Sequence, residues 1–263
     1  RGGDIKKLTE VTYMLRRASV FLFFLAVMCA LGALSERAYS GLVMQQVVYE
    51  EGSPSKQQVT LYIQDNKLKQ VENAGRFSPA VIFDLNSGNI VFVNDEKKLY
   101  ITLNRDEYLK YIESFMSENK NTPQEKRNVK LKKTGETGSF AGYSSKKLEI
   151  YDNGKLQTEY WVSKEPGFSE EIDLDKMSKL MNEVKKISQN IGGSASISDN
   201  EYKVIQEIYE EGYPMKTVYY APEGGGSVVE EIISVKKEDI PVTEFLPPAG
   251  YEKITYQDIL NQR

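Results

Sequence analysis

The chain has 263 residues, of which 27% are charged and 40% are hydrophobic, and its formal net charge is −4. This composition is typical of a globular protein that is long enough to bury a full core. Histidine is absent, which removes the commonest general base and the commonest metal ligand. With a single cysteine, Cys29, the chain forms neither an intramolecular disulfide nor a thiolate metal site.

Residues 1–40 have the three-part layout of a secretory signal. Basic residues precede an apolar run at 20–34, and small residues follow at Ala38-Tyr39-Ser40. The pattern predicts cleavage before Gly41 and export to the periplasm or outer envelope. An uncleaved anchor is the alternative, although a membrane span needs roughly 20 apolar residues and this run is shorter.

Two details of the leader limit how it is interpreted. Residues 1–13 precede a natural start at Met14, and we interpret them as an extension of the gene model. Lipidation of Cys29 is disfavoured because Met28 stands where a small residue is wanted.

Without residues 1–40, six of 34 basic and three of 38 acidic residues are lost, so the net charge becomes −7. An acidic mature chain lacks the excess of basic residues that would neutralise the phosphates of a nucleic acid. The charge therefore argues against a nucleic-acid partner.

The first half of the mature chain alternates with a period of two, as strands do. In QVTLYIQ, for example, Val59, Leu61 and Ile63 share one face. The segments are separated by short turns and should form an antiparallel meander. The predicted strands are residues 42–50, 58–64, 67–73, 80–85, 89–94 and 98–103.

A helix is predicted to follow, because Asn104 and Glu107 have the spacing of a capping box. A polar loop at 117–127 then leads to a strand at 128–133. The stretch 134–163 is interpreted as two strands on a tight turn, in which Asp152-Asn153-Gly154 joins 146–151 to 155–163.

Residues 169–191 form the clearest predicted helix, with apolar residues at three- and four-residue spacings. The segment after Ser198 is either a helix capped by Ser198 and Glu201 or a strand. A last hairpin joins 213–220 to 227–237 across a glycine-rich turn. No interior boundary divides residues 41–263, so a single domain is expected.

Several polar groups are candidates for functional sites. The carboxylates Glu170, Glu171, Asp173 and Asp175 are interpreted as favourable charges at a helix N-terminus rather than as a calcium loop. The run Gly224-Gly225-Gly226 lacks the Lys-Ser/Thr of a phosphate loop. No serine has a histidine partner for a catalytic triad. The sequence therefore predicts a protein without enzymatic activity, metal or cofactor.

A family resemblance rests on four blocks: TGETGSFAGYSSKKLEI, EYWVSKEPGF, EGYPMKT and VKKEDIPVTEFLPPAGYEKI. Together they resemble a secreted bacterial family of unknown function (the DUF4412 type), which belongs to the LolA/LolB lipoprotein-carrier-like superfamily. The resemblance covers roughly residues 41–254. It implies an α+β fold in which a curved antiparallel β half-barrel has amphipathic helices on its concave face. In that superfamily, acyl chains or other apolar groups enter between sheet and helices.

The leading hypothesis is therefore a non-enzymatic envelope protein that binds a lipid or a lipoprotein acyl chain and does not span the membrane. The alternative is a structural or protein-interaction module whose core is filled by its own helices, with an envelope protein as partner. The Met177/Met181 stripe has the same two interpretations, as core or as an adaptable lid over a ligand. Alternation predicts the ligand contacts: Leu61, Ile63, Ile101, Trp161, Met177 and Met181.

Overall fold

The computed structural model describes residues 41–73, 75, 78–118, 127–191, 197–221 and 225–260, and the side chains of 259 and 260 are not described. The predicted signal segment, including Met14 and Cys29, lies outside the described residues. None of the helices in the described part of the chain has the length and apolarity of a membrane span.

The first six strands form the predicted antiparallel meander, in which each strand pairs with the next. Asp65 and Asn66 both adopt positive φ in the β2–β3 turn, a conformation that short polar side chains tolerate. The strands are β1 (Gly41–Glu50), β2 (Gln57–Gln64), β3 (Lys67–Asn73), β4 (Ala80–Asp84), β5 (Asn89–Asn94) and β6 (Leu99–Leu103).

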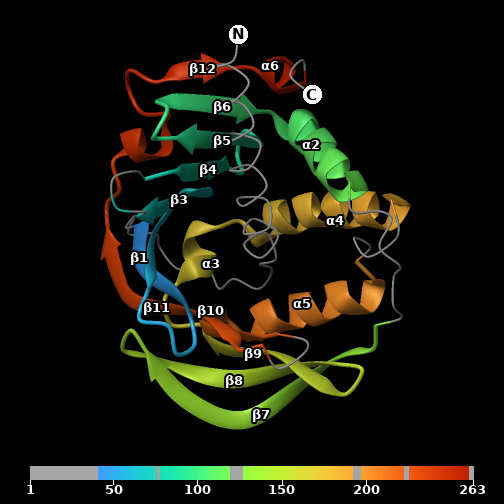
Figure 1. Cartoon of the computed structure of the whole chain (residues 1–263). Helices are drawn as coiled ribbons and strands as arrows, with labels where there is room; N and C mark the ends of the chain where they lie inside the picture. Colours follow the sequence, from blue (N-terminus) through green and yellow to red (C-terminus); the bar gives the residue numbers. More distant parts are fainter. Residues whose placement is uncertain are drawn as a thin grey trace.

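Five later strands form a second meander: β7 (Val129–Phe140), β8 (Tyr143–Asp152), β9 (Lys155–Ser163), β10 (Tyr213–Tyr220) and β11 (Ser227–Glu238). Pairing of β1 with β11 joins the two meanders into one sheet of twelve strands, in the order β12-β6-β5-β4-β3-β2-β1-β11-β10-β9-β8-β7. The sheet is unclosed and curls around the helices (Figure 1), which confirms the predicted half-barrel.

The stretch 134–163 contains parts of three strands rather than the predicted two. β7 continues to Phe140 and turns into β8 at Ala141 and Gly142, which both have positive φ. The predicted β8–β9 turn is present, with positive φ at Asn153 and Gly154. The sequence pattern missed the second half of β7 because Thr-Gly-Glu-Thr-Gly-Ser has little strand propensity, and pairing with β8 imposes the strand.

Helix α2 (Arg105–Glu118) begins with the predicted capping box. The backbone N–H of Asn104 donates to Glu107 Oε2 at 2.9 Å, and the backbone N–H of Glu107 donates to Asn104 Oδ1 at 3.0 Å. Two donors that the helix itself leaves unsatisfied therefore have partners.

The helix predicted over 169–191 is two helices, α3 (Phe168–Glu171) and α4 (Leu174–Ile191). Ile172 is extended at the break and buries its side chain in the core. Asp173 then caps α4, because its Oδ1 accepts from the backbone N–H groups of Asp175 and Lys176, each at 3.1 Å. Burial of Ile172 and the cap at Asp173 together outweigh the continuous helical pattern.

Residues after Ser198 form a helix, α5 (Asp199–Glu211), so the helical alternative is confirmed. The C-terminal tail adds a 3-10 turn, η2 (Val242–Phe245), a short strand, β12 (Glu252–Ile254), and α6 (Tyr256–Leu260). β12 pairs with β6 in parallel, which the sequence pattern did not indicate. Phe245 and Ile240 cover the convex side of β4 and β5, so these two strands are buried on both faces.

Candidate functional site

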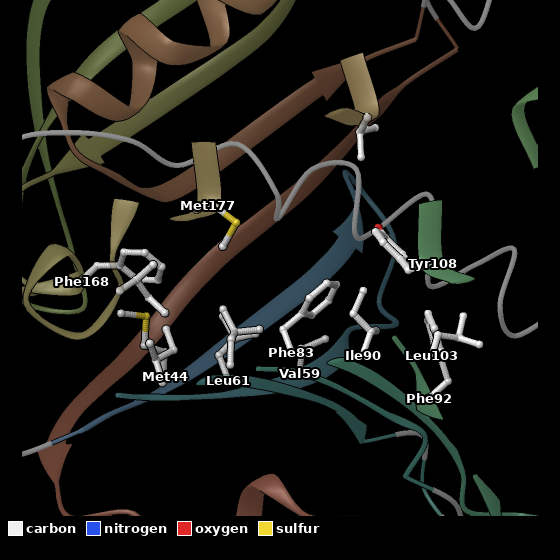
Figure 2. Packing of buried hydrophobic residues seen from close by; sticks show 14 of the residues in the cluster. Met44, Val59, Leu61, Phe83, Ile90, Phe92, Leu103, Tyr108, Phe168 and Met177 are labelled. Atoms are coloured by element: carbon white, nitrogen blue, oxygen red, sulfur yellow. The ribbon is translucent and has the colours of Figure 1, made fainter. Parts of the chain in front are cut away.

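Four of the six predicted ligand contacts lie together in the main core, between the concave face of the sheet and helices α2, α3 and α4. Leu61, Ile63 and Ile101 are at most 1% exposed, and Met177 is 4% exposed. Figure 2 shows Met177 extending from α4 toward the strand side chains Met44 and Leu61. In this half of the concave face, the protein's own side chains fill the space.

The other two predicted contacts lie elsewhere. Met181 packs with Ile197 and Tyr202 in a separate cluster that joins α4 to α5. Trp161 lies on the face of β9 opposite to Tyr160 and Val162, and this opposite face is the one that packs toward α5. Its ring contacts Phe140 at a centroid distance of 5.4 Å, and Lys147 Nζ lies 5.8 Å from the ring centroid. Trp161 therefore shares no site with the concave core.

A pocket of about 190 Å³ lies where the β4–β5 turn meets α2 and α4; we name it the seam pocket. Its apolar wall is formed by Phe83, Ile90, Leu85 and Leu180, the first two of which belong to the main core. The wall is thus continuous with the interior between sheet and helices. The seam pocket is lined by Phe83, Asp84, Leu85, Asn86, Ser87, Gly88, Asn89, Ile90, Arg105, Lys176, Lys179 and Leu180.

The polar side of the seam pocket carries three cations and one carboxylate. Arg105 is held by an ion pair with Glu183, and Lys176 Nζ donates to Asn86 Oδ1 at 2.8 Å. The carboxylate of Asp84 accepts from the backbone N–H groups of Asn86 and Ser87 and so serves the turn. Lys179 is exposed at the rim. The pocket therefore combines a cationic rim with an apolar wall, in a mature chain that is expected to be acidic.

A buried carboxylate marks the other half of the concave face. Cross-strand pairing runs from Val48 through Glu230 and Thr217 to Tyr160, so these residues share the sheet face that also carries Leu61. Gln46 Nε2 donates to Glu230 Oε2 at 3.2 Å. Burial raises the pKa of Glu230 to about 7, against the opposing effect of the Gln46 hydrogen bond.

The charge of Glu230 acts on four tyrosine side chains, which we name the tyrosine cluster: Tyr160 from β9, Tyr209 from α5, and Tyr213 and Tyr219 from β10. Burial raises the pKa of each phenol, and the charge of Glu230 raises it further. Glu230 and the four tyrosines each keep only a small exposed fraction.

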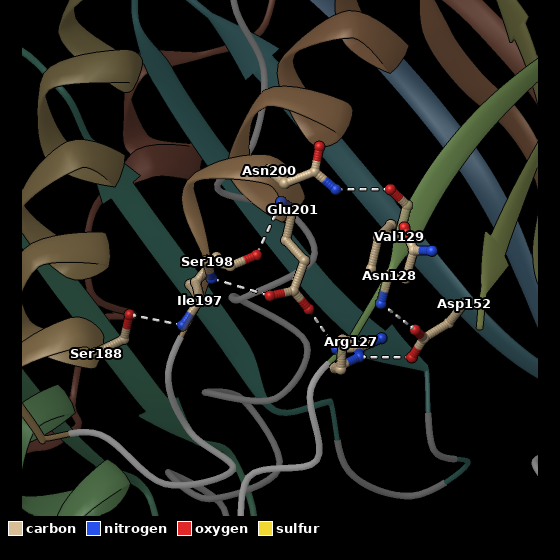
Figure 3. Close-up of polar contacts among 9 residues, drawn as sticks. All are labelled: Arg127, Asn128, Val129, Asp152, Ser188, Ile197, Ser198, Asn200 and Glu201. Carbon is tan, nitrogen blue, oxygen red and sulfur yellow. Dashed lines mark hydrogen bonds and ion pairs between the residues drawn. The ribbon is translucent and has the colours of Figure 1, made fainter.

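Helix α5 is fixed over this region by a polar contact that we name the α5 clasp, made of Arg127, Asp152, Asn200 and Glu201. Arg127 donates to Asp152 Oδ2 at 2.7 Å and to Glu201 Oε1 at 2.5 Å, while Asn200 Nδ2 donates to the carbonyl of Val129 at 2.6 Å (Figure 3). The clasp joins the N-terminus of α5 to the start of β7 and the end of β8. It positions α5 against the inner faces of β7, β8 and β9.

Sequence reasoning missed Glu230 and the tyrosine cluster, although a signal was present. In SVVEEIIS, alternation places Glu230 on the same face as Val228 and Ile232. Glu231 stands in the same pattern between Val229 and Ile233 on the other face, so this signal does not tell the two carboxylates apart. Within the described residues, no group of three or more carboxylate, histidine or cysteine side chains is arranged to hold a metal ion.

Comparisons with known proteins identify the family. Residues 39–251 match the model of the family described as "Domain of unknown function (DUF4412)". No curated protein matches the chain.

Several solved structures match the chain at low similarity. An uncharacterized conserved protein from Thermus thermophilus is 7% identical, with a TM-score of 0.44 over 83% of this chain and 91% of that one. The MucA/MucB complex of Pseudomonas aeruginosa gives 9% identity and a TM-score of 0.41, over 82% of this chain and 58% of that one. A putative outer membrane lipoprotein-sorting protein domain from Vibrio parahaemolyticus is 10% identical, with a TM-score of 0.29 over 80% of this chain and 91% of that one. Likenesses of this size carry no argument about function.

Proposed function

The chain belongs to the DUF4412 family, and from this premise we propose that it is a non-enzymatic, exported envelope protein that binds an amphiphile at the seam between sheet and helices. The seam pocket is the observation that carries this proposal. Its apolar wall leads into the main core, and its rim carries Lys179, which has no ion pair among the described residues, beside Arg105 and Lys176, which pair with Glu183 and Asp173. An anionic head group with an acyl chain matches both surfaces.

The size of the seam pocket limits how such a ligand binds. Pockets for whole drug-sized ligands usually hold about 300–1,000 Å³, whereas this one measures about 190 Å³. It accommodates a head group and the first methylenes of a chain. Deeper entry requires α4 to separate from the sheet, and Met177, at the inner side of α4, has a flexible side chain that adapts to such a change.

The test is laurate binding by native mass spectrometry, with the protein purified gently from the periplasmic fraction of a bacterial host. Lys179→Glu reverses a rim charge at an exposed position, and we expect it to weaken binding about tenfold. The matched control is Lys186→Glu, an exposed lysine of α4 that does not line the pocket. Absence of laurate binding, or equal binding by the two variants, would contradict the proposal. Met177→Asp is unsuitable because it buries a charge in the core.

A protein-interaction module remains the second candidate, and it is favoured by the sealed packing of Leu61, Ile63, Ile101 and Met177. β7 is an edge of the sheet formed by the described residues, and an edge strand can pair with an extended segment of a partner. Its lysines Lys132 and Lys133 are paired with Glu149 and Glu211. If no laurate binds under any condition, this candidate becomes the leading one.

A further inference from the structure

We propose that Asn66 is a positioning residue, whose hydrogen bonds to Asn86 and Asp173 form a latch that holds α4 closed over the seam pocket. We name this contact the Asn66 latch. Asn66 lies in the β2–β3 turn and does not line the pocket, so it acts through the elements that it joins. The role of the latch in ligand entry rests on the proposed function, whereas the latch itself is tested without a ligand.

The first step is the set of hydrogen bonds between the β2–β3 turn and the α3–α4 break. Asn66 Oδ1 accepts from the backbone N–H of Asp173 at 2.5 Å, directly before α4 begins. The backbone N–H of Asn66 donates to the carbonyl of Glu171 at 2.8 Å. The backbone N–H of Asp65 donates to Glu171 Oε2 at 3.3 Å. The turn is therefore fastened to the chain on both sides of Ile172, where α3 and α4 separate.

The second step joins the same asparagine to the β4–β5 turn, which forms one wall of the seam pocket. Asn66 Nδ2 donates to Asn86 Oδ1 at 3.3 Å, and the carbonyl of Asn66 accepts from the backbone N–H of Leu85 at 2.9 Å. Asn86 Oδ1 also accepts from Lys176 Nζ of α4 at 2.8 Å. Asn86 and Lys176 line the pocket from opposite elements, so the latch ties two of its walls together.

The backbone conformation of Asn66 separates its role in the turn from its role in the latch. Asn66 has a φ of 62°, in the left-handed region that glycine and asparagine tolerate. Glycine would satisfy the turn, but it would offer no side chain to the backbone N–H of Asp173 or to Asn86 Oδ1. The substitution Asn66→Gly therefore removes the side-chain bonds of the latch and keeps the turn.

The third step is the contrast between the latch and the core beneath it. Asn86 and Asp173 are exposed and Asn66 is half-buried, so water can replace these hydrogen bonds when they break. Met177, in the first turn of α4, is 4% exposed and belongs to the main core. An acyl chain that passes beyond the pocket requires α4 to move away from the sheet. That movement breaks the latch and exposes Met177.

The direction of the change in binding distinguishes a latch from a structural support. When a ligand enters only an open state, its measured affinity is reduced in proportion to the fraction of molecules that are open. Removal of a latch raises that fraction, so association becomes faster and binding becomes tighter. Loss of a residue that only shapes the pocket would instead weaken binding.

The first measurement is the rate at which a thiol reagent labels Met177→Cys in a protein of residues 41–263, which contain no other cysteine. Labelling of this buried position reports how often α4 opens. We expect Asn66→Gly to accelerate labelling about tenfold, because two side-chain hydrogen bonds are lost. Asn153→Gly is the matched control, because Asn153 also has a positive φ, of 50°, in the β8–β9 turn, which does not line the pocket.

Asn86→Ala tests the latch from its other side. It removes the oxygen that accepts from Asn66 and Lys176, so it should also accelerate labelling of Met177→Cys. Thermal melts establish that each variant is folded at the temperature of labelling. Equal labelling rates in the wild-type, Asn66→Gly and Asn86→Ala backgrounds would overturn the latch.

The second measurement is laurate uptake, followed at timed intervals by native mass spectrometry with methionine retained at position 177. We expect Asn66→Gly to take up laurate faster and to bind it at least about threefold more tightly than the wild type. Weaker binding by Asn66→Gly would overturn the latch. Accelerated labelling in a protein that binds no laurate would support the latch and contradict the proposed function. Unchanged labelling in a protein that binds laurate would do the reverse.

Discussion

The two halves of the concave face are built from one continuous sheet but are completed differently. Under α2 and α4, strands β1 to β6 present apolar side chains that are almost completely buried. Under α5, strands β9 to β11 present a carboxylate, a threonine and half-buried tyrosines. The first half therefore holds the larger apolar core, whereas the second keeps polar groups in the interior beside a smaller apolar cluster under α5.

Phe92→Ala should produce the largest effect, because it removes a fully buried ring from the first half. The ring is 0% exposed and lies beside Tyr111, with centroids 6.3 Å apart. We expect a loss of about 3–5 kcal/mol in the free energy of unfolding, measured by urea denaturation. Val242→Ala, at a position 63% exposed, is the control and should change stability by less than about 0.5 kcal/mol. A loss below about 1 kcal/mol for Phe92→Ala would mean that this half is not the stabilising core.

Glu230 gives the second half a distinctive dependence of stability on pH. Burial raises its folded-state pKa from 4.5 to about 7, so the folded state retains a proton that the unfolded state loses over this interval. The resulting stabilisation is complete below pH 4.5 and is lost as the pH rises through about 7. The loss is at most about 3 kcal/mol, because the side chain is half-buried and partly screened by water.

Glu230→Gln should abolish this loss. Urea denaturation at a series of pH values is expected to show equal stability of variant and wild type near about pH 4.5, and a more stable variant at about pH 8. Glu231→Gln should keep the wild-type profile, because it leaves the Glu230 carboxylate in place. A Glu230→Gln variant that is less stable than the wild type at alkaline pH would show that an internal cation already compensates the charge.

The sequence predicts the first half of the molecule better than the second. Alternation and turn residues locate β1 to β6, and the pairs Asn104/Glu107 and Ser198/Glu201 locate the starts of α2 and α5, because these signals are local. The break at Ile172 depends on burial against distant strands. The second half of β7 and the parallel strand β12 depend on pairing partners that lie far away in the sequence.

The candidate site shows the same limit. Alternation placed Leu61, Ile63 and Ile101 on one face, and the structure brings them together. It cannot tell a residue that faces a ligand from one that faces a helix, since both are apolar. Trp161 lies on the other face, because strand alternation defines two faces but does not indicate which of them is concave. Alternation does not single out Glu230 because its neighbour Glu231 stands in the same pattern on the other face, and the burial of Glu230 depends on elements distant in sequence.

Arg127→Ala should give the smallest of these effects. It tests a difference in the ion pairs that fix the helices over the two halves of the concave face. Arg127 joins Glu201 of α5 to Asp152 of β8, and these two carboxylates are only 10% and 15% exposed, whereas Arg105 of α2 pairs with Glu183 of α4, which is 34% exposed. Removal of Arg127 leaves two mostly buried carboxylates without their cation. We therefore expect the local opening free energy of α5 to fall by about 1–2 kcal/mol.

Hydrogen exchange of the α5 amides measures that change, and amides of α4 serve as an internal reference in the same protein. Arg105→Ala is the matched variant, and we expect it to alter exchange in α2 and α4 by less than about 0.5 kcal/mol, because exposed ion pairs contribute little. Faster exchange confined to α5 in Arg127→Ala would mean that the clasp holds the cover of the tyrosine cluster separately from the apolar core. Equal acceleration in α4 and α5 would instead mean that both helices open as one unit, and the two halves would then not be independent.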